Sequence, residues 1–309
     1  MPSLAVWSQD TVVPQEQPIL FIGDIMLGRS VETLSKKHGA AYPFSDVKDF
    51  FKQHSAVIGN LEGPIRSKHI QTPNGSMHFS FDQSVSKLLK ESGVTHVTLA
   101  NNHTHDEGSV GLQETRDYLK KAGVESFGDP QVFSNDFSAT VYGNIVLLGL
   151  HATNSMPSGS VIRDVITHVR EYQHPKYIIV TVHWGTEYRD TASEFQKKLG
   201  HRLIDAGADM VIGHHPHVIE TIERYKGKVI VYSLGNFIFD QYFSKETQQG
   251  LALQVNPQTL GTKLIPIAIP KSKPKVMSSS DAKKVLIGIA KRSDPELSKE
   301  ILRGKVQGQ

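Results

Sequence analysis

Short runs of apolar, mostly β-branched residues alternate along the chain with segments whose apolar residues recur at helical spacing. The runs predict buried strands at residues 19–22, 56–58, 94–100, 144–150, 177–182, 209–212 and 229–234. Helices are predicted at residues 29–37, 46–53, 83–92, 112–122 and 195–206, and a glycine just after three of them is a typical C-cap signal. This alternation of helices and short strands predicts a layered α/β domain.

The C-terminal part of the chain has a different character. Residues 251–255 and 263–269 predict a β-hairpin, residues 271–275 a linker, and residues 282–292 and 295–303 helices. Residues 271–309 carry ten Lys and Arg against four Asp and Glu. We therefore expect a lead-in at residues 1–18, a main domain at 19–270, and a basic linker and helical tail at 271–309.

Composition narrows the possible functions. The net charge of +3 leaves residues 1–270 at −3, which disfavours nucleic-acid binding, and solvated helix faces explain the basic tail. No run approaches the roughly 18 apolar residues of a membrane span. The N-terminus lacks a basic segment followed by an apolar one, so no signal peptide is predicted and the chain as written reads as cytoplasmic. Because cysteine is absent, any metal site must use His, Asn, Asp and Glu.

Six of the fifteen histidines fall in three short segments, each of which follows a predicted strand. The segments read ANNHTHDEG, VTVHWGTEY and VIGHHPHVIE, and contain His103, His105, His183, His214, His215 and His217. Strand ends in an α/β domain meet at one edge of the sheet, where ligands bind. Imidazoles gathered there, with the amide of Asn102 nearby, predict a divalent metal site. In extended backbone His215 and His217 would point to the same side and chelate one ion.

Other residues have weaker signals. Asp24 follows the first strand and is either a metal ligand or a helix cap. Glu62 follows the second strand and is either a ligand or part of an ordinary turn. His103 is expected to donate a proton to a leaving group, and Arg29 either holds an anionic group or pairs with a surface acid.

Six ordered segments, GDIMLGR, NLEGP, ANNHTHDEG, HWGTEY, GHHPHV and SLGNFIFD, resemble the CapA family of bacterial poly-γ-glutamate capsule synthesis proteins. The resemblance covers residues 19–243. It implies a branch of the calcineurin-like metallophosphoesterases, and hence a four-layer α/β/β/α sandwich. The superfamily pattern aligns with Asp24, Asn102, His103, His183, His215 and His217, and leaves His214 unassigned.

This chain departs from the superfamily pattern at two positions. Met26 replaces a histidine ligand, and Asn60 replaces the carboxylate that bridges two metals, for which Glu62 is a candidate substitute. Two cations without an anionic bridge repel each other strongly, so the second metal is in question. We expect one or two ions of Mn, Fe or Zn, held by Asp24, Glu62, Asn102, His183, His215 and His217.

Two functions are compatible with these residues. The first is a metal-dependent hydrolase that acts on an anionic polymer or small anionic substrate, with His103 and Arg29 as catalytic groups. The second is a non-catalytic, polyanion-binding component of capsule synthesis or export machinery. The retained His103 favours the enzyme, whereas Met26 and Asn60 favour the binder. The resemblance, unlike the N-terminal sequence, implies association with the cell envelope.

Overall fold

The computed structural model describes residues 17–153 and 155–308, so residues 1–16 of the expected lead-in lie outside the described part. The first of its two large sheets has the strand order β16-β15-β14-β1-β2-β5-β6, with β13 beside β1 and β17 beside β15. These strands are β1 (Ile19–Ile25), β2 (Ala56–Leu61), β5 (His96–Thr98), β6 (Glu125–Phe127), β13 (Asn236–Ile238), β14 (Gln249–Val255), β15 (Thr262–Ala268), β16 (Lys275–Val276) and β17 (Lys305–Val306). From β1 to β6 the strands are parallel, while β14 runs antiparallel to β1.

The second sheet has the order β11-β12-β10-β9-β8-β7, with a parallel centre and an antiparallel strand at each edge. Its strands are β7 (Ala139–Tyr142), β8 (Ile145–Ala152), β9 (Tyr177–Trp184), β10 (Met210–His214), β11 (Ile222–Tyr225) and β12 (Lys228–Val231). A small sheet pairs β3 (Ile65–Arg66) with β4 (Phe81–Asp82).

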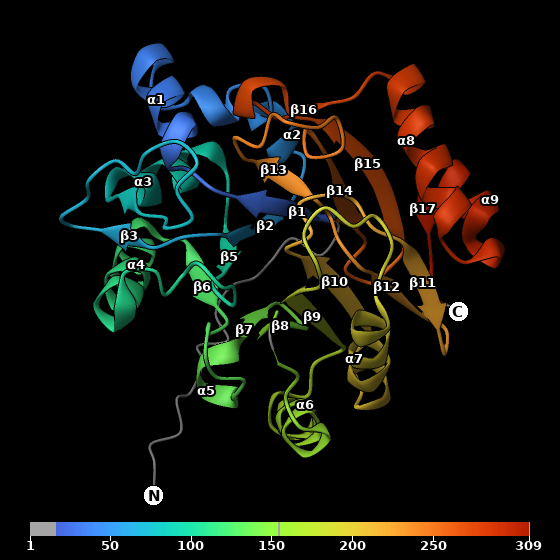
Figure 1. The fold of residues 1–309 in the computed structure, drawn as a ribbon. Helices are drawn as coiled ribbons and strands as arrows, with labels where there is room; N and C mark the ends of the chain where they lie inside the picture. Colours follow the sequence, from blue (N-terminus) through green and yellow to red (C-terminus); the bar gives the residue numbers. More distant parts are fainter. Residues whose placement is uncertain (1–16, 154, 309) are drawn as a thin grey trace, which may run out of the picture.

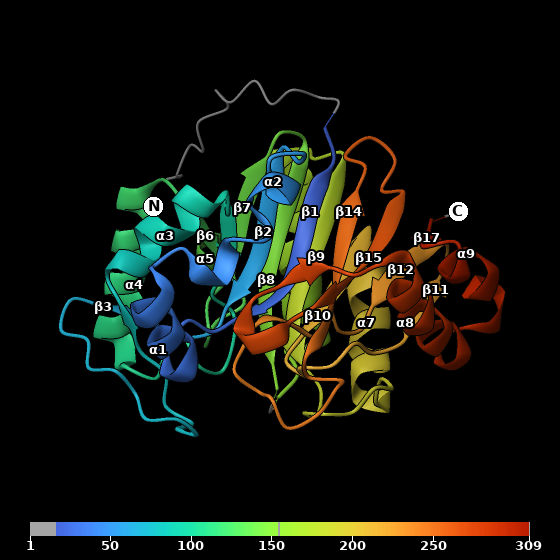
Figure 2. The same cartoon turned by 90° about the horizontal axis from the view of Figure 1, so that it is seen from above.

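Helices cover the outer face of each large sheet (Figures 1 and 2). The first sheet carries α1 (Arg29–His38), α2 (Lys48–Phe51), α3 (Ser84–Ser92) and α4 (Gly108–Ala122). The second carries α5 (Asn135–Ser138), α6 (Gly159–Gln173) and α7 (Glu194–Asp205). The expected four-layer α/β/β/α sandwich is confirmed.

Three apolar clusters fill the three spaces between the layers, because successive strand residues point to opposite faces. In β1, Leu20 and Ile22 face the outer helices, whereas Ile19 and Phe21 face the second sheet. In β8, Leu147 packs between the sheets while Leu148 packs against α6 and α7. Strands buried on both faces explain why the sequence shows continuous apolar runs rather than alternation.

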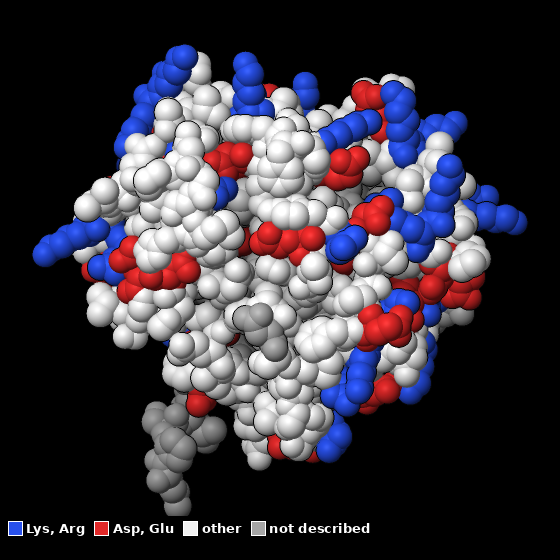
Figure 3. Space-filling view, in the orientation of Figure 1, with Lys and Arg blue, Asp and Glu red and all other residues white. Residues whose placement is uncertain are grey.

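The C-terminal helices α8 (Ser279–Arg292) and α9 (Ser298–Leu302) pack on the same core. Ile289 of α8 and Ile301 of α9 are fully buried in the cluster between the two sheets. Figure 2 shows both helices at the opposite end of the molecule from α3 and α4. Their Lys and Arg side chains project outward at the upper right of Figure 3, mixed with acidic residues.

Several elements differ from the sequence prediction. Residues 271–275 are not a free linker, because a 3₁₀ turn at Pro270–Ser272 leads into β16, which pairs with β15. The sequence pattern predicts no helix at residues 159–173, yet α6 forms there and buries Ile162, Val165, Ile166 and Val169. These β-branched residues have low helix propensity, and packing on the sheet outweighs it. Within the described residues, no helix has the length and apolar character needed to cross a membrane.

Candidate metal centre

The two sheets bring their carboxyl ends together at one place. In the first sheet Asp24 of β1 pairs in register with Asn60 of β2, and Glu62 follows directly. In the second sheet His183 of β9 pairs with His214 of β10, and the histidine loop follows. As a result, the six predicted ligands lie in one mostly buried cluster: Asp24, Glu62, Asn102, His183, His215 and His217.

Asp24 is fully buried at the centre of this cluster. Asn60 donates a hydrogen bond of 2.8 Å from Nδ2 to its Oδ1, and the backbone N–H of His215 donates to its Oδ2 over 3.4 Å. Nδ1 of His214 lies 3.2 Å from Oδ1, and Nδ1 of His217 lies 3.3 Å from Oδ2. Burial opposes ionisation, but His214 and His217 together outweigh it and hold the pKa of Asp24 well below its usual range.

Glu62 is also fully buried and is incompletely bonded. Its Oε1 has no hydrogen-bond partner among the described residues and lies 3.7 Å from Nε2 of His217. Burial, opposed by His217 but reinforced by the charge of Asp24, raises the pKa of Glu62 to about 7. A buried carboxylate oxygen without a partner is a candidate ligand for a cation.

The tautomer of His217 follows from its neighbours. Asn236 donates from Nδ2 to the backbone oxygen of Thr247, which can only accept, so Oδ1 of Asn236 faces His217 at 3.0 Å. His217 therefore donates from Nδ1 and turns Nε2 toward Glu62 and Glu187. Burial lowers the pKa of His217, but Glu62 and Asp24 more than compensate and raise it to about 9, so a cation at Nε2 would have to displace a proton.

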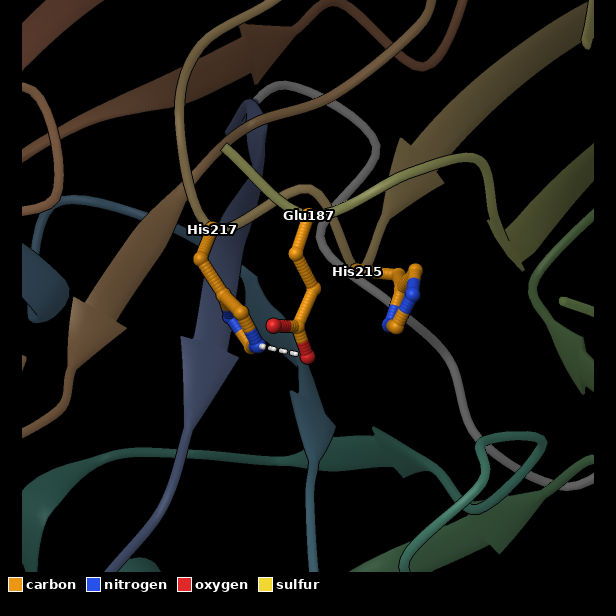
Figure 4. Close-up of side chains that lie close together, drawn as sticks. All are labelled: Glu187, His215 and His217. Carbon is orange, nitrogen blue, oxygen red and sulfur yellow. Dashed lines mark ion pairs between the residues drawn. The ribbon is translucent and has the colours of Figure 1, made fainter. Parts of the chain in front are cut away.

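Glu187 belongs to this centre, although the sequence analysis does not include it among the ligands. Oε1 of Glu187 lies 3.9 Å from Nε2 of His217, and one ligand atom from each of Glu187, His215 and His217 lies within 4.8 Å of the others (Figure 4). Glu187 is the glutamate of the HWGTEY segment and comes four positions after His183. The superfamily pattern assigns no ligand to this position. A glutamate in a predicted loop also gives no sign, in a single sequence, that it binds a metal.

The histidine loop does not have the extended backbone that the sequence analysis assumes. His215 and His217 have φ angles of 97° and 58°, both in the left-handed region. Their ring centroids are nevertheless 5.9 Å apart, and both rings approach Glu187. Left-handed backbone at two non-glycine residues is uncommon and is maintained here by the packed loop, a situation found at functional sites.

His183 and Asn102 form the other side of the cluster. Nε2 of His183 lies 2.7 Å from Oδ1 of Asn102, and Nδ1 lies 3.2 Å from Nδ2 of Asn60. One ligand atom of His183 also lies within 4.8 Å of Asp24 and Glu62. Burial, together with the neighbouring imidazole of His215, holds the pKa of His183 well below its usual range, so this imidazole is neutral.

His103 lies beside the cluster and is held in place by two contacts. Its Nδ1 lies 2.9 Å from Oδ2 of Asp106, and its ring packs against that of Phe79, with the centroids 4.0 Å apart and the planes tilted by 30°. Its main chain is fixed because Oδ1 of Asn101 accepts from the N–H of His103. With Nδ1 bonded to a carboxylate, Nε2 is the nitrogen that is left to exchange a proton.

Arg29 and Met26 are placed differently from the other candidates. The guanidinium of Arg29 forms a buried ion pair with Asp240 and also donates to the backbone oxygen of Ser76. The thioether of Met26 accepts from the N–H of Gly28 at 3.2 Å, and the side chain packs in the apolar core beneath α1. Met26 therefore does not replace the missing histidine as a ligand.

The residues present fit a divalent cation. Two groups, Asp24–Glu62–His183 and Glu187–His215–His217, each offer three nitrogen and oxygen atoms within 4.8 Å of one another. Two of these residues, Glu62 and His215, carry buried side-chain atoms that lack a partner within the described chain. Mixed imidazole and carboxylate donors without sulfur suit Mn, Fe and Zn.

A groove with a volume of about 940 Å³ borders the centre. Val218, next to His217, and Asp190, in the loop of Glu187, line it together with the aromatic rings of Tyr242 and Phe243. The ring of Tyr188 links the two regions, because its centroid lies 5.1 Å from that of Phe243 and 6.2 Å from that of His217. The groove therefore lies next to the candidate centre, and its lining residues are distinct from the candidate ligands.

Glu220, shortly after the histidine loop, gives a prediction about stability. It is fully buried, its Oε2 accepts from Gln196 at 2.6 Å, and its Oε1 has no partner among the residues described. Burial raises its pKa from 4.5 to about 8. The folded protein therefore keeps a proton that the unfolded chain releases, and stability falls as pH rises between these two values.

We expect Glu220→Gln to remove this part of the pH dependence. Urea unfolding of metal-free protein at about pH 9 should show the variant to be more stable by about 1–3 kcal/mol, with little difference at about pH 4. Equal pH slopes for the two proteins would show that Glu220 is ionised in the fold.

Comparison with known proteins identifies the family of this chain. The model of the family described as bacterial capsule synthesis protein PGA_cap matches residues 18–241, which include every candidate ligand. The chain belongs to this family.

Relatives of this PGA_cap protein include the capsule biosynthesis protein CapA of Bacillus anthracis, 32% identical, with 89% of this chain and 75% of the relative covered. The PGA biosynthesis protein CapA of Bacillus subtilis (strain 168) is 29% identical, with 93% of this chain and 80% of the relative covered. A crystal structure of a hypothetical protein from Thermus thermophilus overlaps 84% of this chain and 99% of its own, with a TM-score of 0.48 and 18% identity. The resemblance noted from the sequence motifs is confirmed by the family match.

Proposed function

We propose that this PGA_cap protein is a metal-dependent hydrolase that acts on an anionic substrate during the synthesis of poly-γ-glutamate or a related capsule polymer. The observation that carries the proposal is the group Glu187–His215–His217, beside which Glu62 presents an unpartnered Oε1. The printed names of the Bacillus relatives, a capsule and a PGA biosynthesis protein, support the biological context.

The metal ligands in this proposal are Asp24, Glu62, Asn102, His183, His215 and His217, to which we add Glu187. A divalent cation bound there would supply a Lewis acid that polarises a phosphoryl or acyl oxygen of the substrate. The protein's own carboxylates and imidazoles hold that charge in a buried place, where water screens it little. The partners in this proposal are an anionic polymer or small anionic substrate and the capsule synthesis machinery.

His103 would act as the general acid. Asp106 fixes its ring through Nδ1 and Phe79 covers one face, so the ring keeps one orientation. A proton on Nε2 can then pass to a leaving oxygen at the edge of the centre. Arg29 would contribute positive charge nearby, although Asp240 already neutralises much of it.

One observation favours the second candidate function, a non-catalytic binder of polyanions. In the groove, Lys284 pairs with Asp281 and Arg292 approaches Asp190. Lys245 and Lys275 remain as exposed lining cations that form no ion pair within the described residues. Such lysines suit the repeated carboxylates of a polyglutamate chain, and they lie in the groove rather than among the candidate metal ligands.

Turnover and metal content, measured on the same preparation, distinguish the two functions. The purified protein would be supplied with Mn²⁺ and tested on a generic phosphodiester and on poly-γ-glutamate. Metal-dependent hydrolysis of either supports the enzyme. Binding of poly-γ-glutamate without any hydrolysis supports the binder, and the absence of bound metal rejects the metal-dependent mechanism.

The groove gives a prediction of its own. Reversing both charges in Lys245→Glu/Lys275→Glu should weaken poly-γ-glutamate binding about tenfold, since surface ion pairs contribute about 0.2–1 kcal/mol each and repulsion replaces them. The difference should shrink as salt is added, because exposed charges are screened. The matched control is Lys120→Glu/Lys121→Glu at the end of α4, far from the groove (Figure 2). Equal loss in the control would show that only overall charge matters.

A further inference from the structure

The orientation of the Asn60 side chain can be deduced from groups whose donor or acceptor character is not in doubt. Oδ1 of Asn101 accepts from the backbone N–H groups of His103 and Thr104, at 3.1 and 2.9 Å. Backbone N–H groups can only donate, so the other end of the Asn101 amide must be Nδ2. That Nδ2 donates to the backbone oxygen of Leu61 at 2.9 Å and to Asn60 at 3.0 Å.

The Asn60 atom that faces Asn101 must therefore be the oxygen, and Nδ2 must point into the metal centre. There it lies 2.8 Å from Oδ1 of Asp24, 3.4 Å from Oε2 of Glu62 and 3.2 Å from Nδ1 of His183. All four residues are fully buried or nearly so. Asn60 thus presents two N–H donors to the place from which a bridging carboxylate would hold two ions.

This amide also fixes the tautomer of His183. Nδ1 of His183 faces an N–H donor, so it is unprotonated and the proton is on Nε2, which donates to Oδ1 of Asn102. Both nitrogens of His183 are therefore satisfied by amides. His217 differs, because its Nδ1 donates to Asn236 and its Nε2 faces the carboxylates of Glu62 and Glu187.

We propose that the centre binds a single cation, at Glu62, Glu187, His215 and His217, and that Asn60 with His183 and Asn102 fills the position of the second. This inference rests on the proposed metal-dependent function and specifies which half of the site holds the metal. The carboxylates of Glu62 and Glu187 face Nε2 of His217 at the first position. On the His183 side, Asp24 and Glu62 both accept from the amide of Asn60, and His183 and Asn102 are neutral and bonded to each other.

Electrostatics gives the same result. Repulsion between two ions grows with the product of their charges, so a pair of divalent cations in a buried site needs an anion between them. In place of an anion, Asn60 supplies the positive end of an N–H dipole. The side chain of Met26 packs in the apolar core and offers no ligand atom. Asn60→Asp would place a carboxylate at the same position with almost the same shape.

Metal stoichiometry tests the proposal without reference to activity. Metal-free full-length protein would be dialysed against excess Mn²⁺ and its Mn content measured, with paramagnetic resonance distinguishing isolated ions from an exchange-coupled pair. We expect one isolated ion per chain in the wild type and in Asn60→Ala, which removes the amide without adding a charge. We expect two coupled ions in Asn60→Asp. Glu187→Gln should weaken binding of the single ion at least tenfold.

The alternative outcomes separate this inference from the proposed function. Two ions in the wild type would overturn the inference, by making Glu62 the bridge, and would leave the metal-dependent function intact. No bound ion in the wild type would reject both. A folded Asn60→Asp with one ion, or a Glu187→Gln with unchanged affinity, would also overturn it. If Asn60→Asp fails to fold by circular dichroism, the wild-type stoichiometry and Glu187→Gln still decide.

Discussion

Replacing both histidines in His215→Ala/His217→Ala is expected to reduce bound metal from at least one ion per chain to background. Each histidine offers a ring nitrogen to the same group as Glu187, and Nε2 of His217 faces two carboxylates. Without the imidazoles, the remaining carboxylates would have to hold the ion alone in a buried place where charges need close pairing. Elemental analysis of protein purified under identical conditions measures the loss.

A matched control keeps the number of removed histidines constant. His168→Ala/His174→Ala removes one imidazole within α6 and one directly after it, and α6 lies on the outer face of the second sheet (Figure 1). This variant should retain the full metal content. Full occupancy in His215→Ala/His217→Ala would contradict the ligand assignment, and equal loss in both variants would point to a general loss of folding.

His103→Ala is expected to leave the metal content unchanged while lowering hydrolysis of a responsive substrate by about 10²–10⁴-fold, the usual contribution of a general acid. His103 bonds to Asp106 rather than to a candidate ligand, so its removal should not disturb metal binding. Steady-state kinetics and metal analysis of the same preparation would measure both quantities.

Two further variants refine this result. His105→Ala changes a partly exposed histidine of the same segment and should keep wild-type activity. Asp106→Asn should lower activity less than His103→Ala and shift the pH profile, because it alters how the imidazole is held without removing it. If the hydrolysis rate in His103→Ala matches the wild type, His103 is structural and the general-acid mechanism is wrong.

The sequence was sufficient to predict those parts of the fold that depend on the pattern of apolar residues and glycines. Buried strands such as β1 and β9 read as apolar runs, and glycines mark helix ends at Gly93 and Gly123. The missed strands, such as β6 and β13, are three residues long, and each pairs with a strand from another part of the chain. Such elements have no periodicity of their own to detect.

The candidate ligands could be proposed because they follow strands directly, as Asp24 and His183 do. The donor role of Asn60 could not be predicted, since it depends on the orientation of Asn101. Two backbone N–H groups in the loop of Asn101 and the backbone oxygen of Leu61 in β2 set that orientation. Glu187 joins the centre because its loop folds back over the histidine loop, with the N–H of Tyr188 donating to the oxygen of Pro216. Contacts of this kind depend on tertiary structure and leave no local pattern.

The position of β1 has a consequence for biosynthesis. This strand, which carries Asp24, pairs with β2 on one side and with β13 and β14 on the other. β13 and β14 come from residues 236–255, so one edge of β1 is unpaired until that part of the chain has been made. A ribosome would have to release most of the domain before Asp24 and the histidine loop meet, and until then β1 keeps an unpaired apolar edge. Nascent chains of this protein should therefore be open to aggregation until residues 236–255 have emerged, and acquire the ability to bind metal only after the histidine loop has been released.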